Sequence, residues 1–131
     1  MTRMRRSLPL GLSMVVAGCL AVAALGATRP VNLVATPTLK AQLRTAHLRA
    51  TGVPASKIRG PLKGQTYYAR LGTTHWALAT FSQAGVGTED QPEAFRRLAG
   101  GKWSDRGDNG QCKVPRAVIT LWNLKRLLVA C

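Results

Sequence analysis

Acidic residues are scarce in this sequence, which has 5 Asp and Glu against 19 Lys and Arg in 131 residues. The formal net charge at pH 7 is therefore +14. So basic a surface attracts polyanions, such as nucleic acid, anionic lipid head groups or cell-wall polymers. A basic protein whose charge merely reflects its composition is the plainer interpretation. Either way, few carboxylates are left for acid–base or metal chemistry.

Residue types that carry catalysis are also few, with 2 His and 3 Cys in the chain. No catalytic, metal-binding or nucleotide-binding motif stands out. His47 and His75 each lack a second ligand at metal spacing. Cys112 could act as a nucleophile only with a base such as His75 beside it, and no local signature surrounds it. We therefore expect a non-enzymatic protein without catalytic residues, metal or cofactor; an envelope enzyme or enzyme inhibitor with an unrecognised site is the alternative.

The N-terminus has the pattern of a secretory signal, because three arginines in the first six residues precede a run without charge up to Thr28. Small residues permit cleavage by a signal peptidase after Gly26 or Ala27. Val16–Cys19 has the form of a bacterial lipobox, which makes Cys19 a candidate for lipid attachment. Residues 7–27 are also long enough to cross a hydrocarbon core of about 30 Å as a retained anchor. In all three cases the basic end stays inside and residues 28–131 are exported, so membrane contact occurs only through residues 7–27.

The exported part begins with a predicted linker, residues 28–35, followed by a well-delimited helix. Thr36 can cap the helix, Pro37 fits its first position, and Gly52 follows its last turn. An apolar stripe recurs at helical spacing and consists of Leu39, Leu43, Ala46 and Ala50. A neighbouring stripe, formed by Lys40, Arg44 and His47, is interpreted as a basic surface. The helix either lies on an anionic surface or docks its apolar side on a sheet and exposes these charges.

Two hairpins are expected after a connector at residues 53–64. The first joins Thr66–Leu71 to His75–Phe81, and the second joins Ala94–Leu98 to Lys102–Asp105, with a loop at residues 82–92 between them. A helical pattern resumes from Pro115. The sequence thus predicts an α+β domain over residues 36–131, with an N-terminal helix, a four-stranded antiparallel meander and a C-terminal helix, behind a signal or anchor segment at residues 1–27.

Two cysteines, Cys112 and Cys131, lie in the part expected to be exported. Outside the cell an even number of cysteines indicates a disulfide. Such a bridge closes a loop of about 20 residues and stabilises by about 3 kcal/mol. It requires the C-terminal helix to end near Lys125 so that the chain can return toward Cys112. A helix that continued to Ala130 would hold the two cysteines apart.

Other polar clusters give weaker functional signals. Glu89, Asp90 and Glu93 could serve glycoside hydrolysis or bind Ca²⁺, but they lack the spacing of an EF-hand, and we expect them to neutralise Arg96 and Arg97 instead. A second group, Asp105 and Asp108, lies in "SDRGDNG", which contains an adhesion tripeptide and hints at Ca²⁺. Asp, Asn and Gly are also what tight turns require, and a turn is the interpretation we favour.

Aromatic residues next to a basic one could form a platform for single-stranded nucleic acid or sugar. The set consists of Tyr67, Tyr68, Trp76 and Phe81 with Arg70. In a domain of this size the aromatic rings are needed first for the core. We therefore expect no nucleic-acid partner.

Four stretches resemble a set of small exported proteins of unknown function from high-GC Gram-positive bacteria. They are "YYARLGTTHWALATFS", "GVGTEDQPEAFRR", "GGKWSDRGDNGQC" and "VPRAVITLWNL". The resemblance covers about half of the chain; it implies fold and compartment and no catalytic residue. The leader, the charge and the absence of a catalytic motif lead us to expect an exported cell-envelope protein, secreted or tethered outside the cytoplasmic membrane, that binds anionic cell-wall polymers or lipid head groups.

Overall fold

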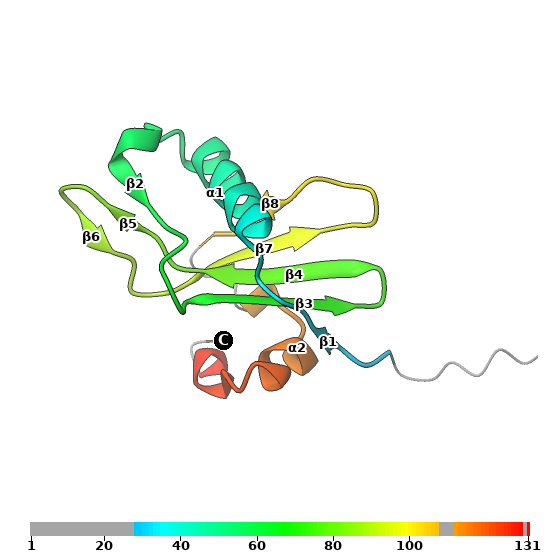
Figure 1. The fold of residues 1–131 in the computed structure, drawn as a ribbon. Helices are drawn as coiled ribbons and strands as arrows, with labels where there is room; N and C mark the ends of the chain where they lie inside the picture. The colour runs from blue at the N-terminus through cyan, green and yellow to red at the C-terminus, as the bar shows by residue number, and fades with distance from the viewer. Residues whose placement is uncertain (1–27, 108–111, 130) are drawn as a thin grey trace, which may run out of the picture.

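The computed structural model describes residues 28–107, 112–129 and 131. The predicted leader, with Cys19, Gly26 and Ala27, lies outside these residues, and so does Asp108. The described part is α+β, as predicted, and contains two antiparallel sheets (Figure 1). Within the described ranges, no helix has the length and apolar character needed to cross a membrane.

The main sheet has five strands in the order β1-β3-β4-β7-β8, and every neighbouring pair is antiparallel. The strands are β1 (Val31–Asn32), β3 (Thr66–Leu71), β4 (Thr74–Ala79), β7 (Glu93–Arg97) and β8 (Ser104–Asp105). The sheet thus has one strand more than expected. This strand, β1, lies in the segment expected to be a linker and pairs Val31 with Arg70 at the edge of the sheet.

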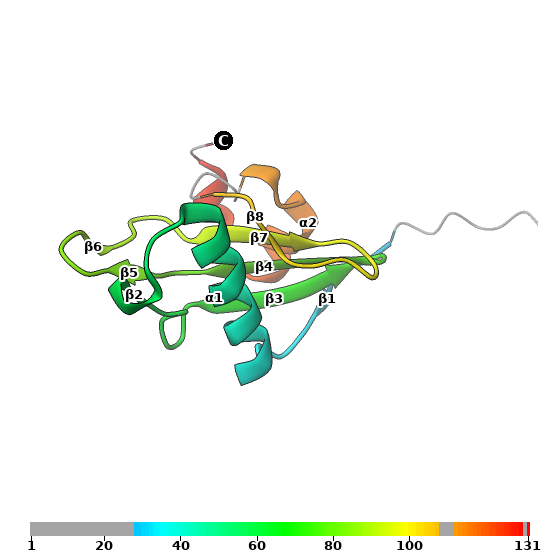
Figure 2. The same cartoon turned by 90° about the horizontal axis from the view of Figure 1, so that it is seen from above.

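A second sheet of three short strands has the order β2-β5-β6. Its strands are β2 (Ile58–Arg59), which follows a 3₁₀ turn η1 (Ala55–Lys57), β5 (Ser82–Gln83) and β6 (Gly87–Thr88). They lie in the segments expected to be a connector and a loop. Two-residue strands leave no alternating pattern in the sequence, so the sequence does not predict them. Figure 2 shows this second sheet reaching beyond one end of the main sheet.

The first helix, α1 (Pro37–Thr51), has the ends that its sequence predicted. The Oγ1 atom of Thr36 accepts the backbone N–H of Leu39 at 3.1 Å. At the other end Gly52 has φ 69° and donates its N–H to the carbonyl of Leu48. This left-handed conformation is easy only for a residue without a Cβ, so Gly52 ends the helix.

The C-terminal helix is shorter than expected, because α2 spans only Arg116–Leu121 and is followed by a 3₁₀ turn, η3 (Lys125–Leu128). Between them Asn123 has φ 57°, a left-handed conformation that asparagine tolerates better than most residues. The chain therefore turns back. The predicted disulfide is present between Cys112 and Cys131, whose Cα atoms are 5.4 Å apart.

Both faces of the main sheet are covered, one by α1 and the other by α2 and η3 (Figure 1). Alternation along β4 divides the core: Ala77 and Ala79 pack beneath α1, whereas Trp76 and Leu78 pack beneath α2. We call these two sides the α1 face and the α2 face. The candidate functional residues described below lie mainly on the α1 face.

Candidate functional site

A groove of about 390 Å³ lies between α1 and the turn that joins β7 to β8. We call it the basic groove, because three of its lining residues are cationic: Arg49, Arg97 and Lys102. The other lining residues are Thr38, Ala41, Gln42, Thr45, Gly101 and Trp103. None of the nine is acidic, so the positive potential of the groove is not neutralised by its own walls.

Arg97 is held in place within the basic groove. Its guanidinium carbon lies 5.1 Å from the centre of the Trp103 ring, a cation–π arrangement. The Trp103 ring is itself buried, and its Nε1–H donates to Oε1 of Gln42 on α1 at 3.2 Å. A guanidinium that is already ordered loses less freedom when it binds an anion. An anion that bound Arg97 would therefore meet a guanidinium already positioned by Trp103.

The positive charge continues from the groove across the main sheet. Arg97 on β7 pairs in register with His75 on β4, and His75 pairs with Arg70 on β3. Neighbouring strands lie about 4.8 Å apart, so these side chains form a row, which we call the basic row. Burial lowers the pKa of His75, and the charges of Arg97 and Arg70 lower it further. His75 also shares a 2.7 Å hydrogen bond with the Tyr68 hydroxyl.

The basic surface predicted on α1 is wrong for His47, which is only 2% exposed. The buried side of the helix consists of Leu39, Leu43, Ala46 and His47, whereas Ala50 is exposed. Arg44 has a structural role, because its guanidinium donates to the carbonyls of Gly60 and Ala55 at 3.2 and 2.8 Å. Lys40 is half-buried.

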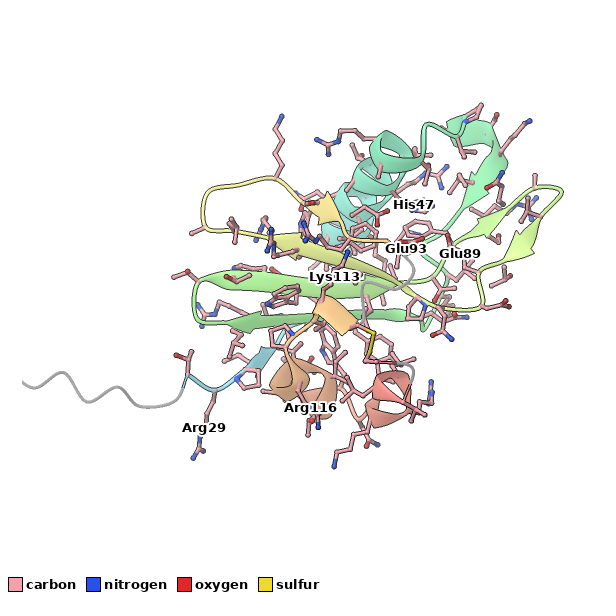
Figure 3. The ribbon with its side chains drawn as sticks, turned by 180° about the vertical axis from the view of Figure 1, so that it is seen from behind. Arg29, His47, Glu89, Glu93, Lys113 and Arg116 are labelled. Atoms are coloured by element: carbon pink, nitrogen blue, oxygen red, sulfur yellow. A yellow bond between two sulfur atoms is a disulfide. The ribbon has the colours of Figure 1, made fainter. Side chains whose placement is uncertain are left out.

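His47 lies close to Glu89 and Glu93 (Figure 3). Together with Asp105, to which His47 is hydrogen-bonded, these residues form what we call the histidine–carboxylate cluster. Nδ1–H of His47 donates to Oδ2 of Asp105 at 2.9 Å. Nε2 of His47 lies 3.7 Å from Oε1 of Glu89. One ligand atom from each of His47, Glu89 and Glu93 lies within 4.8 Å of the others, which is a spacing that could accommodate a metal ion.

The carboxyl groups of the cluster have opposite pKa shifts. Burial raises the pKa of Glu89, although the N–H of Phe81 and the nearby His47 oppose the rise. Burial would also raise the pKa of Asp105, but its hydrogen bonds with His47, the Gly107 N–H and Glu93 outweigh burial and lower it. Asp105 therefore stays ionised more readily than Glu89.

The acidic residues of the sequence lie in different surroundings, and Glu89 does not have the partner that its sequence context suggested. Among the described residues Glu89 forms its ion pair with His47 rather than with Arg96 or Arg97. Glu93 is 7% exposed and faces the cluster, while Asp90 is exposed in the preceding loop. Asp105 accepts the Gly107 N–H at 2.8 Å, so it does serve the turn that was expected there.

Two other candidate sites are excluded by where their residues lie. Cys112 is bonded to Cys131 and has no free thiol to act as a nucleophile. The aromatic side chains do not form one platform, because Trp76 packs on the α2 face and Phe81 on the α1 face, both buried.

Comparison with known proteins gives no family model that matches the chain, and no match among curated proteins or solved structures. The functional conclusion therefore rests on the side chains of this chain. No local motif signals the histidine–carboxylate cluster, since His47 and Asp105 are 58 residues apart. Glu93 lies two residues before the buried Phe95 on β7, and this alternation is a sequence signal that its side chain faces inward.

Proposed function

We propose that the protein is an exported, non-enzymatic module that binds an anionic polymer of the cell envelope in the basic groove and along the basic row. The observation that carries the proposal is the groove itself, with three cationic side chains and no acidic one among its lining residues. The overall charge of +14 favours the same class of partner. The Cys112–Cys131 disulfide favours an oxidising compartment, as expected for an exported protein.

A flexible polymer suits this surface better than a flat bilayer does. Arg97 lies in a concave groove between α1 and the β7–β8 turn, half-buried against Trp103. A phosphate group on a flexible chain can enter the groove, whereas head groups in a plane reach mainly the rim. Along the basic row, the successive cations follow the strand spacing of the sheet, so one chain could contact several of them.

The test is binding of the full-length chain, in mild detergent, to poly(glycerol phosphate) at increasing salt. Exposed charges are screened over about 10 Å at 0.1 M salt, so we expect the affinity to fall at least tenfold between about 50 and 500 mM. Arg97→Gln removes an ordered cation from the groove, and we expect a further loss of about tenfold, or about 1.4 kcal/mol. Isothermal titration calorimetry measures both effects.

The matched control is Arg116→Gln, which removes the same charge from the exposed start of α2 on the opposite face (Figure 3). We expect it to weaken binding less than twofold. Equal losses for the two variants would mean that only net charge matters and that the groove is no site. Binding to anionic vesicles without binding to the polymer would replace the polymer by a lipid surface.

A further inference from the structure

We propose that His47, Glu89 and Glu93 bind one divalent transition-metal ion of the Zn²⁺ type, with Asp105 holding the imidazole in the orientation that binding requires. This site is separate from the basic groove and does not depend on the proposed polymer binding. It departs from the sequence-based expectation of no metal, which rested on the absence of a second ligand near either histidine.

The first argument is distance. Ligand atoms about 2.1 Å from a tetrahedral ion lie about 3.4 Å from one another. Nε2 of His47 and Oε1 of Glu89 are 3.7 Å apart, which is close to that value. The candidate ligand atoms of His47, Glu89 and Glu93 all lie within 4.8 Å of one another. Small side-chain adjustments are therefore enough to close the set around an ion.

The second argument is the way in which the imidazole is held. Metal-binding histidines generally donate their other ring N–H to a carboxylate or carbonyl, which fixes the tautomer and the ring orientation. Asp105 provides that carboxylate at 2.9 Å from Nδ1, and its side chain is only 3% exposed. Nδ1 therefore carries a hydrogen, and Nε2 is the ring nitrogen on the Glu89 side that would bind the ion. The Phe81 ring stacks on the imidazole at 4.1 Å and 5°, which fixes the ring plane.

Glu89 is oriented in a similar manner. Its Oε2 atom accepts the backbone N–H of Phe81 at 3.2 Å, which leaves Oε1 facing His47. One carboxylate oxygen is thus engaged with the backbone while the other faces the centre of the cluster. Such outer hydrogen bonds are typical of metal sites built in advance of the ion.

Charge gives a third, independent argument. Glu89, Glu93 and Asp105 gather around a single imidazole, although the chain has only 5 acidic residues and a net charge of +14. Among the described residues, Glu89 and Asp105 form their ion pairs with His47 and with no lysine or arginine. A divalent cation would balance the charges of both Glu89 and Asp105, whereas a single imidazole can balance only one of them. Charge at a buried position is costly unless it is balanced, so the pairing of these two carboxylates with one imidazole favours an added cation.

The site also has an entrance. Glu89 lies on the wall of a pocket of about 400 Å³, whose other lining residues include Gln65, Asp90 and Gln91. The Glu89 side chain is 27% exposed, while that of His47 is 3% exposed. An ion can therefore reach the cluster from the Glu89 side, and a water molecule can complete its coordination there. One imidazole nitrogen with carboxylate oxygens favours zinc-like ions over Ca²⁺, which prefers oxygen ligands alone.

The ligands come from separate elements: His47 from α1, Glu93 from β7 and Glu89 from the segment between β6 and β7. Asp105 adds β8. A bound ion would tie these elements together. Because the ion binds the folded chain, it would also raise the melting temperature, by an amount that grows with the logarithm of the ratio of ion concentration to Kd.

The experiment uses the full-length chain in mild detergent, stripped with a chelator and titrated with Zn²⁺ by calorimetry. We expect one ion per chain and a higher melting temperature. Co²⁺ should bind in its place and give visible absorption bands typical of low-coordinate cobalt. His47→Gln and Glu89→Gln should weaken binding at least about 100-fold, and Asp105→Asn about 10- to 100-fold. Glu93→Gln keeps the shape of the side chain and should weaken binding without unfolding the protein, as checked by circular dichroism.

Two control variants test whether the ion binds at His47, Glu89 and Glu93. Asp90→Asn changes the exposed acid beside Glu89, and His75→Gln changes the other histidine of the chain; neither should affect Zn²⁺ binding. A Kd weaker than about 1 mM would overturn the proposal. Affinity unchanged in His47→Gln and Glu89→Gln would overturn it too, because the ion would then bind elsewhere. Preference for Ca²⁺ over Zn²⁺ would refute the role of the imidazole.

Discussion

The two faces of the main sheet differ in the interactions that stabilise them and in the polar and charged groups that lie on them. On the α2 face Trp76, Leu78 and Trp122 form an apolar layer, and the Cys112–Cys131 disulfide closes the segment that covers it. On the α1 face an apolar layer is also present, but His47 and its carboxylates are buried beside it. The basic groove and the basic row lie on this same side.

This difference predicts that substitutions on the two faces have different effects on stability and on binding. The α2 face needs only apolar burial and a covalent link, so substitutions there act on the free energy of unfolding. The α1 face contains polar groups that depend on the position of one helix, because α1 supplies both Arg49 of the groove and His47 of the cluster. Changes on the α1 face should therefore affect stability and binding together.

The largest expected effect comes from a matched pair of core substitutions, Leu43→Ala on the α1 face and Leu78→Ala on the α2 face. Both leucines have no exposed surface, so each change should cost about 2–5 kcal/mol of unfolding free energy. Leu43→Ala should also weaken poly(glycerol phosphate) binding, because it loosens α1. Urea unfolding measures the first effect and calorimetry, under conditions where both variants are folded, measures the second. Equal loss of binding in Leu78→Ala would show that the faces are not independent.

Removing the disulfide should have a smaller effect, confined to stability. The Cys112→Ser/Cys131→Ser variant loses a link across 19 residues and should unfold with about 3 kcal/mol less free energy. We expect its affinity for the polymer to match that of the original chain wherever both are folded. Unfolding of the original chain with and without reductant is the control. A change in polymer affinity on reduction would show that the disulfide also affects binding on the α1 face.

The smallest predicted effect is a dependence of polymer binding on pH through His75. Its pKa lies below the ordinary value of 6.5 because of burial, Arg97 and Arg70, so the ring is neutral at pH 7. Protonation at lower pH adds a cation to the basic row, and a bound polyanion offsets its repulsion by the two arginines. Binding should therefore strengthen as the pH falls below 6.5, by about two- to fivefold. Fluorescence anisotropy at pH 7.5 and 5.5 tests this, and the same rise in His75→Gln would assign it to another group.

The elements that could be predicted are those with local signals. Thr36, Pro37 and Gly52 delimit α1, because capping chemistry depends on residues within one turn of the helix. The hairpin of β3 and β4 follows from its alternation and the Gly72 turn, where φ is 61°. The disulfide follows from the presence of just two cysteines, Cys112 and Cys131, after the predicted leader. Each of these signals can be read in a short window of sequence.

The orientation of α1 could not be predicted, and His47 shows why. The spacing of Leu39, Leu43 and Ala46 is compatible with a buried side that includes either Ala50 or His47. A rule that keeps polar residues outside selects Ala50, whereas the structure buries His47. The rule fails because carboxylates from distant segments lie against the His47 ring, and one of them accepts its hydrogen bond. Only the tertiary structure brings these partners together.

The edges of the main sheet have a further consequence. Strands β3, β4 and β7 have five or six residues, but the outermost strands, β1 and β8, have only two each. Long unpaired edges invite other chains to add a strand, and short edge strands are one way in which proteins prevent aggregation. Within the described residues, the sheet thus offers little exposed ladder for a neighbouring chain.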